Sequence, residues 1–215
     1  MRTPTIMMIL GFACTLLTSA LVQADTTPEV AALQQRWAEV NYLLDGKPQV
    51  EAFNTLIDDA EKVTRKQSNS ADAWIWSGII RSSYAGAKGG LGALSAAKAA
   101  KADFEKAMTL DADAMDGSAY TSLGVLYLNV PGWPVGFGDE EKGVELLKKG
   151  LELSPGGIDA NYFYAEYLFK QKQDEDATRY LNRAMSAPAR PGRELADQGR
   201  RSEIEQILQQ IEARH

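Results

Sequence analysis

Cysteine and histidine are almost absent from this 215-residue chain. Cys14 is its single thiol, and His215, the last residue, is its single imidazole. A Ser-His or Cys-His nucleophile pair is therefore excluded, and we expect no enzymatic activity. A basic surplus is absent too, because the net charge is −6. This argues against nucleic acid or an anionic membrane as a partner, since both attract clustered lysine and arginine.

Two features that might suggest a metal or phosphate site have plainer explanations. The acidic runs Asp58, Asp59, Glu61 and 139–141 fit a helix surface and the start of a helix, where negative charge is favourable. The glycine-rich stretch 86–92 lacks the lysine and hydroxyl residue of a phosphate-binding loop, and it follows a helical pattern rather than a strand. We expect neither a metal nor a cofactor.

The first 24 residues are typical of an export signal. Arg2 is followed by an apolar stretch from Ile6 to Leu17, and Val22-Gln23-Ala24 provides a cleavage motif. The apolar stretch is shorter than the roughly 20 residues that a membrane span needs. An uncleaved anchor and a lipid-modified Cys14 are the alternatives. We expect cleavage on export to the periplasm and no stable membrane span afterwards, so that the mature protein has no thiol and depends on packing for its stability.

Alanine, leucine, lysine and glutamate are abundant after the signal, and runs of β-branched residues are few, which favours helix. Amphipathic stretches alternate with Gly, Pro and Asn/Asp/Ser clusters, so we expect helix, turn, helix throughout a single domain at 25–215. The expected helices are 28–44, 49–66, 71–84, an alanine-rich helix ending at 110, 117–129, 140–153, 158–171, 174–187 and about 194–214.

Three helix pairs, at 71–112, 117–155 and 158–189, repeat one pattern of bulky and small residues. The positions that carry it are Trp74, Gly78, Ala100, Phe104 and Ala107, then Tyr120, Leu123, Gly124, Tyr127, Gly143, Leu147, Gly150 and Pro155, then Tyr164, Ala165, Leu168, Ala177, Leu181 and Ala184. This is the tetratricopeptide pattern, in which small residues let two helices approach and bulky ones fill the space beside them.

The repeat predicts an all-α fold. Each pair leaves an apolar face that only the next pair can cover. With a degenerate pair at 27–66, we predict a tetratricopeptide-type α-solenoid of about four helix pairs, ending in a capping helix at 193–214.

Two repeats are longer than the pattern at their internal turn, by about ten residues around 86–94 and about seven around 130–138. Internal turns of stacked repeats emerge on one edge, so we expect the two loops to be neighbours. Trp133 and Phe137 either pack against their own helices or form a rim that contacts a ligand or partner.

Segments of the second half, from Tyr120 onward, resemble a known family. They are the loop 131–139, the stretch 158–164, and Ala187-Pro188 followed by 190–197. Together they are similar to the T component associated with TRAP transporters, periplasmic tetratricopeptide proteins that work beside a substrate-binding protein. The resemblance implies a periplasmic helper protein with a hydrophobic cleft.

The first helix of each repeat contributes residues to the concave groove of such a solenoid. The expected groove positions are Ile75, Ile79, Ser82, Thr121, Val125, Leu128, Tyr162, Glu166 and Phe169, most of them apolar. An exposed apolar strip of this size needs a cover. The cover is either the apolar stripe of the C-terminal helix, a hydrophobic small molecule or amphipathic partner segment, or a second copy of the chain.

The tail carries Arg190, Arg193, Arg200 and Arg201. These arginines either bind an anion or, as we expect, form a surface salt-bridge network with the interleaved acidic residues of the tail.

We therefore expect a periplasmic tetratricopeptide-repeat adaptor that binds another envelope protein, and the resemblance makes it an accessory component of a TRAP-type transport system. The alternative is a carrier that holds a hydrophobic small ligand in the concave groove. A pocket of several hundred cubic ångströms lined by Ile79, Val125, Tyr162 and Phe169 would favour the carrier.

Overall fold

The computed structural model describes residues 26–214, the side chain of Leu91 excepted. The predicted export signal, with Cys14, lies outside the described residues. Within them the chain forms helices and no strand. The helices are α1 (Pro28–Leu43), α2 (Gly46–Lys66), α3 (Ala71–Lys88), α4 (Gly90–Leu110), α5 (Ala114–Asn129), α6 (Glu140–Leu153), α7 (Ile158–Lys170), α8 (Asp174–Met185) and α9 (Glu194–Glu212). The all-α solenoid is confirmed.

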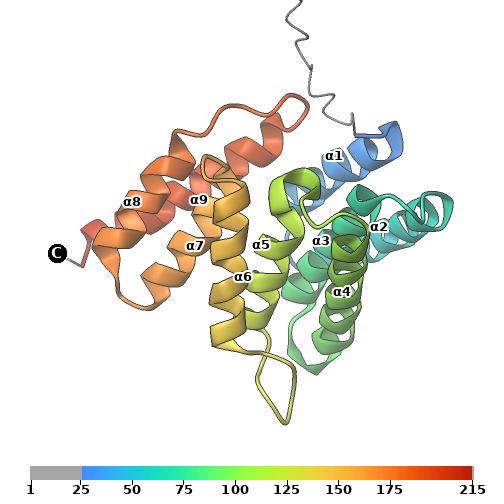
Figure 1. Cartoon of the computed structure of the whole chain (residues 1–215), viewed down its shortest axis with the longest axis horizontal. Helices are drawn as coiled ribbons and strands as arrows, with labels where there is room; N and C mark the ends of the chain where they lie inside the picture. The colour runs from blue at the N-terminus through green and yellow to red at the C-terminus, as the bar shows by residue number, and fades with distance from the viewer. Residues whose placement is uncertain (1–25, 215) are drawn as a thin grey trace, which may run out of the picture.

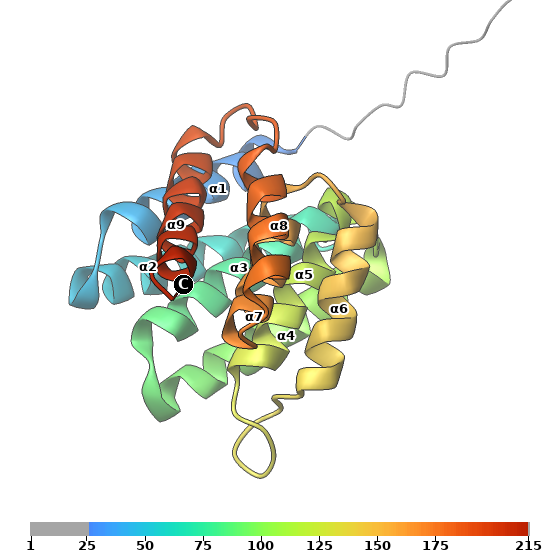
Figure 2. The same cartoon turned by 90° about the vertical axis from the view of Figure 1, so that its left-hand side faces the viewer.

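The helices form two layers (Figure 1). The even-numbered helices α2, α4, α6 and α8 each pack against the odd-numbered helix that precedes them and form the outer layer. The odd-numbered helices contact one another in the order α1, α3, α5, α7, α9, and α9 returns to contact α1 (Figure 2). The inner layer is therefore a closed ring of five helices rather than an open groove.

The C-terminal helix closes this ring by joining both ends of the solenoid. Ala196 is part of the core formed by α1, α2 and α3, whereas Ile204, Ile207 and Ile211 pack in the core of α7 and α8. At the seam Gly199 lies directly against the ring of Tyr42, where a larger residue would have no room. The apolar stripe of α9 thus seals the ends of the solenoid.

Small residues hold the helix pairs together, as the repeat pattern predicts. A methyl group added at Gly78 would lie 2.5 Å from Phe104 Cε1, and one added at Gly124 would lie 2.9 Å from the carbonyl oxygen of Gly143. Alanine, with its Cβ, therefore does not fit at Gly78 without displacing the Phe104 ring, or at Gly124 without displacing the backbone of α6.

The glycine-rich stretch 86–92 differs from the expectation. It is not a ten-residue loop, because α3 continues to Lys88 and α4 begins at Gly90. Gly89 and Gly90, with φ of 62° and 63°, make the whole turn in a backbone region that glycine enters without strain. The extra residues lengthen the two helices by additional turns.

Candidate functional site

The ring of inner helices surrounds a partly open cavity of about 640 Å³, called here the ring cavity. Its walls come from α1, α3, α5, α7, the segment before α9, and α9 itself. The lining includes apolar Trp37, Trp76, Ile79, Met115, Val125 and Phe163, hydroxyl-bearing Ser82, Ser83, Ser118, Thr121 and Ser122, acidic Asp72, Asp111, Asp113, Asp116 and Asp159, and basic Arg190, Arg193 and Arg200. The groove is therefore far more polar than its predicted positions indicated.

Only some of the predicted groove residues line this cavity. Ile79 and Val125 do, but Ile75 is fully buried against Ala107 of α4 and Ala119 of α5. Tyr162 is 7% exposed and lies beneath the Arg200 guanidinium. The prediction was wrong for these two because it counted positions along one helix, whereas the next helix pair covers part of each inner face.

Phe163, which the groove prediction omitted, lies in the ring cavity beside Val125. It also contributes to a second, smaller cavity of about 300 Å³ between the loop 131–138 and α7, which Leu128 and Glu166 line. Phe169 lines neither cavity, and its ring lies 3.9 Å from the guanidinium carbon of Arg214. The residues predicted to line one groove thus lie in three places: the ring cavity, the smaller pocket and the core.

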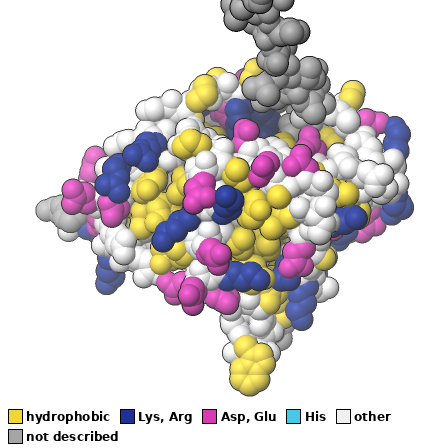
Figure 3. Space-filling view, viewed as in Figure 1, with side chains coloured by type: hydrophobic (Ala, Val, Ile, Leu, Met, Phe, Trp, Pro, Cys, Tyr) yellow, Lys and Arg dark blue, Asp and Glu magenta, His cyan; other side chains and the backbone are white. Residues whose placement is uncertain are grey.

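The two aromatic residues of the loop 131–138 have different environments, a point that the sequence did not decide. Phe137 packs edge-to-face on Tyr127, with ring centroids 5.5 Å apart, whereas Trp133 is 90% exposed. The loop protrudes from the body of the molecule with apolar side chains at its tip (Figures 1 and 3). Its base is closed by the Gly138 N–H, which donates to the Pro131 carbonyl at 2.9 Å.

The two internal turns are neighbours, as expected. A methyl group added at Gly136 would lie 3.4 Å from Leu94 Cδ1, and Phe137 packs with Ala93 of α4 in one apolar cluster. The loop 131–138, called the Trp133 loop from here on, is therefore supported from the side by the start of α4.

The tail arginines form a network, but it is buried rather than on the surface. Arg200 is 7% exposed, and its Nε donates to Asp159 Oδ1 at 2.9 Å. Arg190 donates to the other oxygen of Asp159 at 2.7 Å and to Asp197 Oδ1 at 2.7 Å. Arg200 also donates to Glu203 at 2.5 Å. We name these groups the Arg200 network. The sequence prediction missed Asp159 because it lies on α7, thirty residues before the tail.

The Arg200 network has a marked effect on protonation. Burial alone would raise the pKa of Asp159, but the guanidinium groups of Arg200 and Arg190 outweigh it and hold the pKa well below its usual range. For Glu203 burial dominates over Arg200, so its pKa is raised. Asp159 is therefore the anion that this network stabilises.

Arg193 lies beside this network but is not part of it. Its guanidinium carbon is 4.8 Å from the centroid of the Trp76 ring, and within residues 26–214 its side chain makes no ion pair or hydrogen bond. Burial, followed by the repulsion of Arg190, lowers the pKa of Arg193 to about 10, so the group is still a cation at neutral pH. The Nε of Arg193 and the Nε1 of Trp76 are both buried donors without an acceptor in the described part of the chain.

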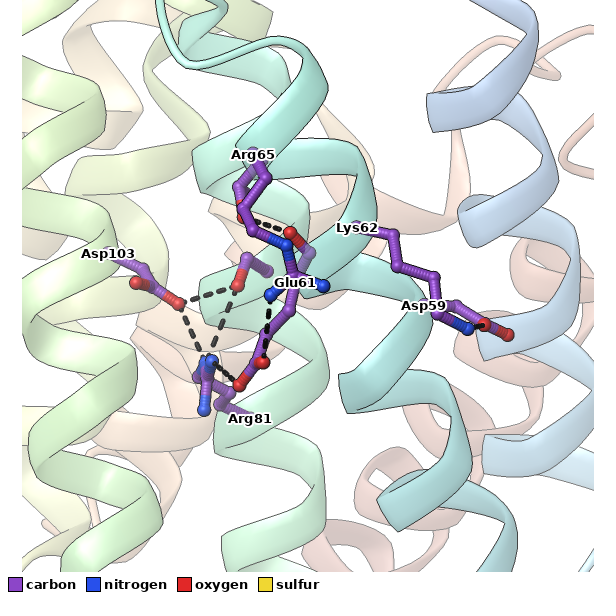
Figure 4. Close-up of polar contacts among 8 residues, drawn as sticks. Asp59, Glu61, Lys62, Arg65, Arg81 and Asp103 are labelled. Atoms are coloured by element: carbon purple, nitrogen blue, oxygen red, sulfur yellow. Dashed lines mark hydrogen bonds and ion pairs between the residues drawn. The ribbon is translucent and has the colours of Figure 1, made fainter.

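A second network, the Arg81 network, lies away from the cavity lining, between α2, α3 and α4 (Figure 4). Arg81 Nη2 donates to Glu61 Oε1 at 2.8 Å, and Arg81 Nε donates to Asp103 Oδ2 at 2.9 Å. The Ser77 hydroxyl donates to the same Asp103 oxygen at 2.6 Å. Burial raises the pKa of Asp103 in spite of these donors.

The acidic runs have structural partners, as predicted. Asp139 caps α6 by accepting from the Lys142 N–H at 3.1 Å, and Asp59 pairs with Lys62 at 2.8 Å. No cluster of three or more histidine, cysteine or acidic residues suited to a metal occurs among residues 26–214. Across that same range, every helix is too short or too polar to cross a membrane.

Comparison with known proteins does not identify a family for this chain. No family model matches the sequence, and no curated protein matches it. Among solved structures, a crystal structure of the MamA protein is similar with a TM-score of 0.42 at 16% identity, over 86% of this chain and 91% of that one. Another MamA crystal structure has a TM-score of 0.34 at 19% identity, over 66% and 91%. At these values no functional inference is transferred.

Proposed function

We propose that this protein is a periplasmic tetratricopeptide-type adaptor that captures another envelope protein through the Trp133 loop. The observation that carries this proposal is a tryptophan that is 90% exposed on a protruding, internally hydrogen-bonded loop. Indole side chains at rigid, exposed positions are frequent binding anchors, because they bury a large area at little entropic cost.

The surroundings of the loop favour a protein partner. Val135 is 52% exposed beside Trp133, so the tip offers a small apolar contact surface. The pocket behind it, lined by Glu166, Lys170 and other polar groups, supplies hydrogen-bonding partners for the rim of an interface. Export to the periplasm is proposed from the signal-like N-terminus, and a role beside a TRAP-type transporter rests on the family resemblance.

Site-specific photocrosslinking in living cells tests this function. A photoreactive amino acid at Val135 should crosslink one envelope protein in the wild-type background, and Trp133→Ala should abolish that product. The matched control places the same group at Leu43, which is 64% exposed on α1, far from the loop in sequence. Equal crosslinking with and without Trp133, or the same product from position 43, would contradict the proposal.

Cell fractionation tests the location separately. We expect the processed chain, beginning at Asp25, in the periplasmic fraction, and an unprocessed cytoplasmic chain would contradict this.

The ring cavity favours a second function, the carriage of a small molecule. A closed ring of helices around about 640 Å³ has the size of a ligand site. Of the four lining residues that the carrier hypothesis named, Ile79 and Val125 line it, whereas Tyr162 and Phe169 do not. The ligand would not be purely hydrophobic, because the walls also carry serine, aspartate and arginine side chains.

A further inference from the structure

The ring cavity contains an arginine, Arg193, that contacts the Trp76 ring but has no ion-pair or hydrogen-bond partner among residues 26–214. Arg190 and Arg200 are held by Asp159, and each oxygen of that carboxylate already accepts from one of them. Arg193, the third arginine in the cavity wall, has no carboxylate within ion-pair distance in the described chain. The network therefore satisfies two guanidinium groups and leaves one available to a ligand.

Asp159 and Asp197 lie near Arg193 without pairing with it, and in the described chain the Trp76 ring beneath its guanidinium carries a second unpaired donor. Trp76 is 2% exposed, lines the cavity, and has no acceptor for its indole N–H within residues 26–214. Arginine and the indole N–H can only donate, so neither can satisfy the other. Because buried donors in folded proteins are nearly always paired, these two groups call for an acceptor, and a negatively charged acceptor matches the guanidinium best.

The rest of the cavity restricts the shape and charge of the ligand. Ile79, Val125 and Phe163 give it an apolar surface beyond the donors. The segment between α4 and α5 contributes Asp111 and Asp113, and the start of α5 contributes Asp116; all three are exposed and repel a second negative charge. One anionic group with an apolar body satisfies both constraints.

We propose that the ring cavity binds a small amphipathic molecule with a single anionic head group, with Arg193 and Trp76 holding the head and Ile79, Val125 and Phe163 contacting the apolar body. This inference rests on the second proposed function, carriage of a small molecule, and is independent of the adaptor function at Trp133.

Isothermal titration of the processed chain with three probes of equal length tests this proposal. The probes are octanoate, 1-octanol and the dianion octanedioate. We expect octanoate to bind about tenfold more tightly than octanol, because a charge-assisted pair with Arg193 is formed only by the anion. Octanedioate should also bind more weakly than octanoate, because its second carboxylate meets apolar walls and acidic residues.

Two variants assign the effect to the predicted donors. Arg193→Gln should weaken octanoate binding about tenfold and leave octanol binding unchanged. Trp76→Phe, which keeps an aromatic ring and removes the N–H, should weaken octanoate binding selectively as well. Arg183→Gln on α8 is the matched control, because it removes the same charge away from the cavity lining and should leave all three affinities unchanged. Thermal unfolding shows whether each variant is folded.

The outcomes separate this inference from the carrier function. If octanol and octanoate bind equally, or if both cavity variants retain full octanoate affinity while folded, the anionic head group is wrong and the carrier function stands. If none of the probes binds, the inference and the carrier function both fail. Neither result affects the crosslinking test of the adaptor.

Discussion

The Arg81 network and the Arg200 network contain the same kinds of side chain but differ in charge balance. In the Arg81 network one guanidinium serves two carboxylates, those of Glu61 and Asp103. In the Arg200 network Asp159 lies between two guanidinium groups, with a third nearby in Arg193. The ratio of cations to anions around each carboxylate therefore differs.

This difference explains the opposite pKa shifts. Burial raises the pKa of Asp103, and a single arginine does not overcome it. Burial acts on Asp159 as well, but two arginines reverse its effect and lower the pKa. The first network is a structural link between neighbouring helices, whereas the arginines of the second line the ring cavity.

Removal of the central arginine should give the largest contrast between the networks. Arg200→Met should lower the free energy of unfolding by about 4 kcal/mol, because it removes a guanidinium that is only 9% exposed and that pairs with both Asp159 and Glu203. Arg81→Met should cost about 2 kcal/mol, because Glu61 is 41% exposed and water can replace its partner. Urea denaturation at pH 7 measures both. Arg179→Met, at an exposed pair, is the control and should change stability by less than about 0.5 kcal/mol.

Neutralising the central carboxylates should give a contrast in the same direction, with a smaller loss of stability in each network. Asp159→Asn should cost about 3 kcal/mol, a value below that of Arg200→Met because its side chain is 35% exposed toward the cavity. Asp103→Asn should cost about 1 kcal/mol, since the amide keeps an oxygen that accepts from Ser77. Equal losses in the same denaturation assay would show that the charge balance of the networks is not what distinguishes them.

The stability difference between the wild type and each of these two variants should change with pH in opposite directions. The folded pKa of Asp159 lies below its unfolded value, so its contribution is present above about pH 4 and is lost at lower pH. The stability difference between wild type and Asp159→Asn should therefore shrink below about pH 4. The folded pKa of Asp103 is raised, so its contribution is present below about pH 4 and is lost as the pH rises through the folded value.

As the pH falls from 7 toward 4, the wild type should accordingly gain stability relative to Asp103→Asn. Denaturation curves for the three proteins at several pH values test this, and parallel curves for the two variants would refute the assigned shifts.

Sequence reasoning found the repeats because their spacing is local. Gly78 and Phe104, or Gly124 and Leu147, meet within one helix pair, where the period of the helix and a short turn determine which residues face each other. The glycine-rich stretch 86–92 misled the prediction, since glycine permits a turn of two residues as readily as a long loop. The length of the helices on either side was decided by packing of their apolar faces.

The candidate site was only partly predictable for the same reason. Ile79 and Val125 were found, whereas Phe163 and Asp159 were not, because their exposure depends on how α7 packs against α5 and α9. The sequence did not show whether Trp133 or Phe137 would be exposed. Only the packing of Phe137 on Tyr127 in the folded protein distinguishes the two residues.

The sequence by itself determined the helical class and the pairing of neighbouring helices, since these follow from composition and from contacts over short separations. The tertiary structure decided that the solenoid closes into a ring, because the contact of α9 with α1 joins segments about 170 residues apart that no local pattern relates. That closure brings Asp159, Trp76 and the tail arginines together. It converts a groove that looked apolar into a cavity whose wall holds Arg193, a cation with no ion pair among residues 26–214.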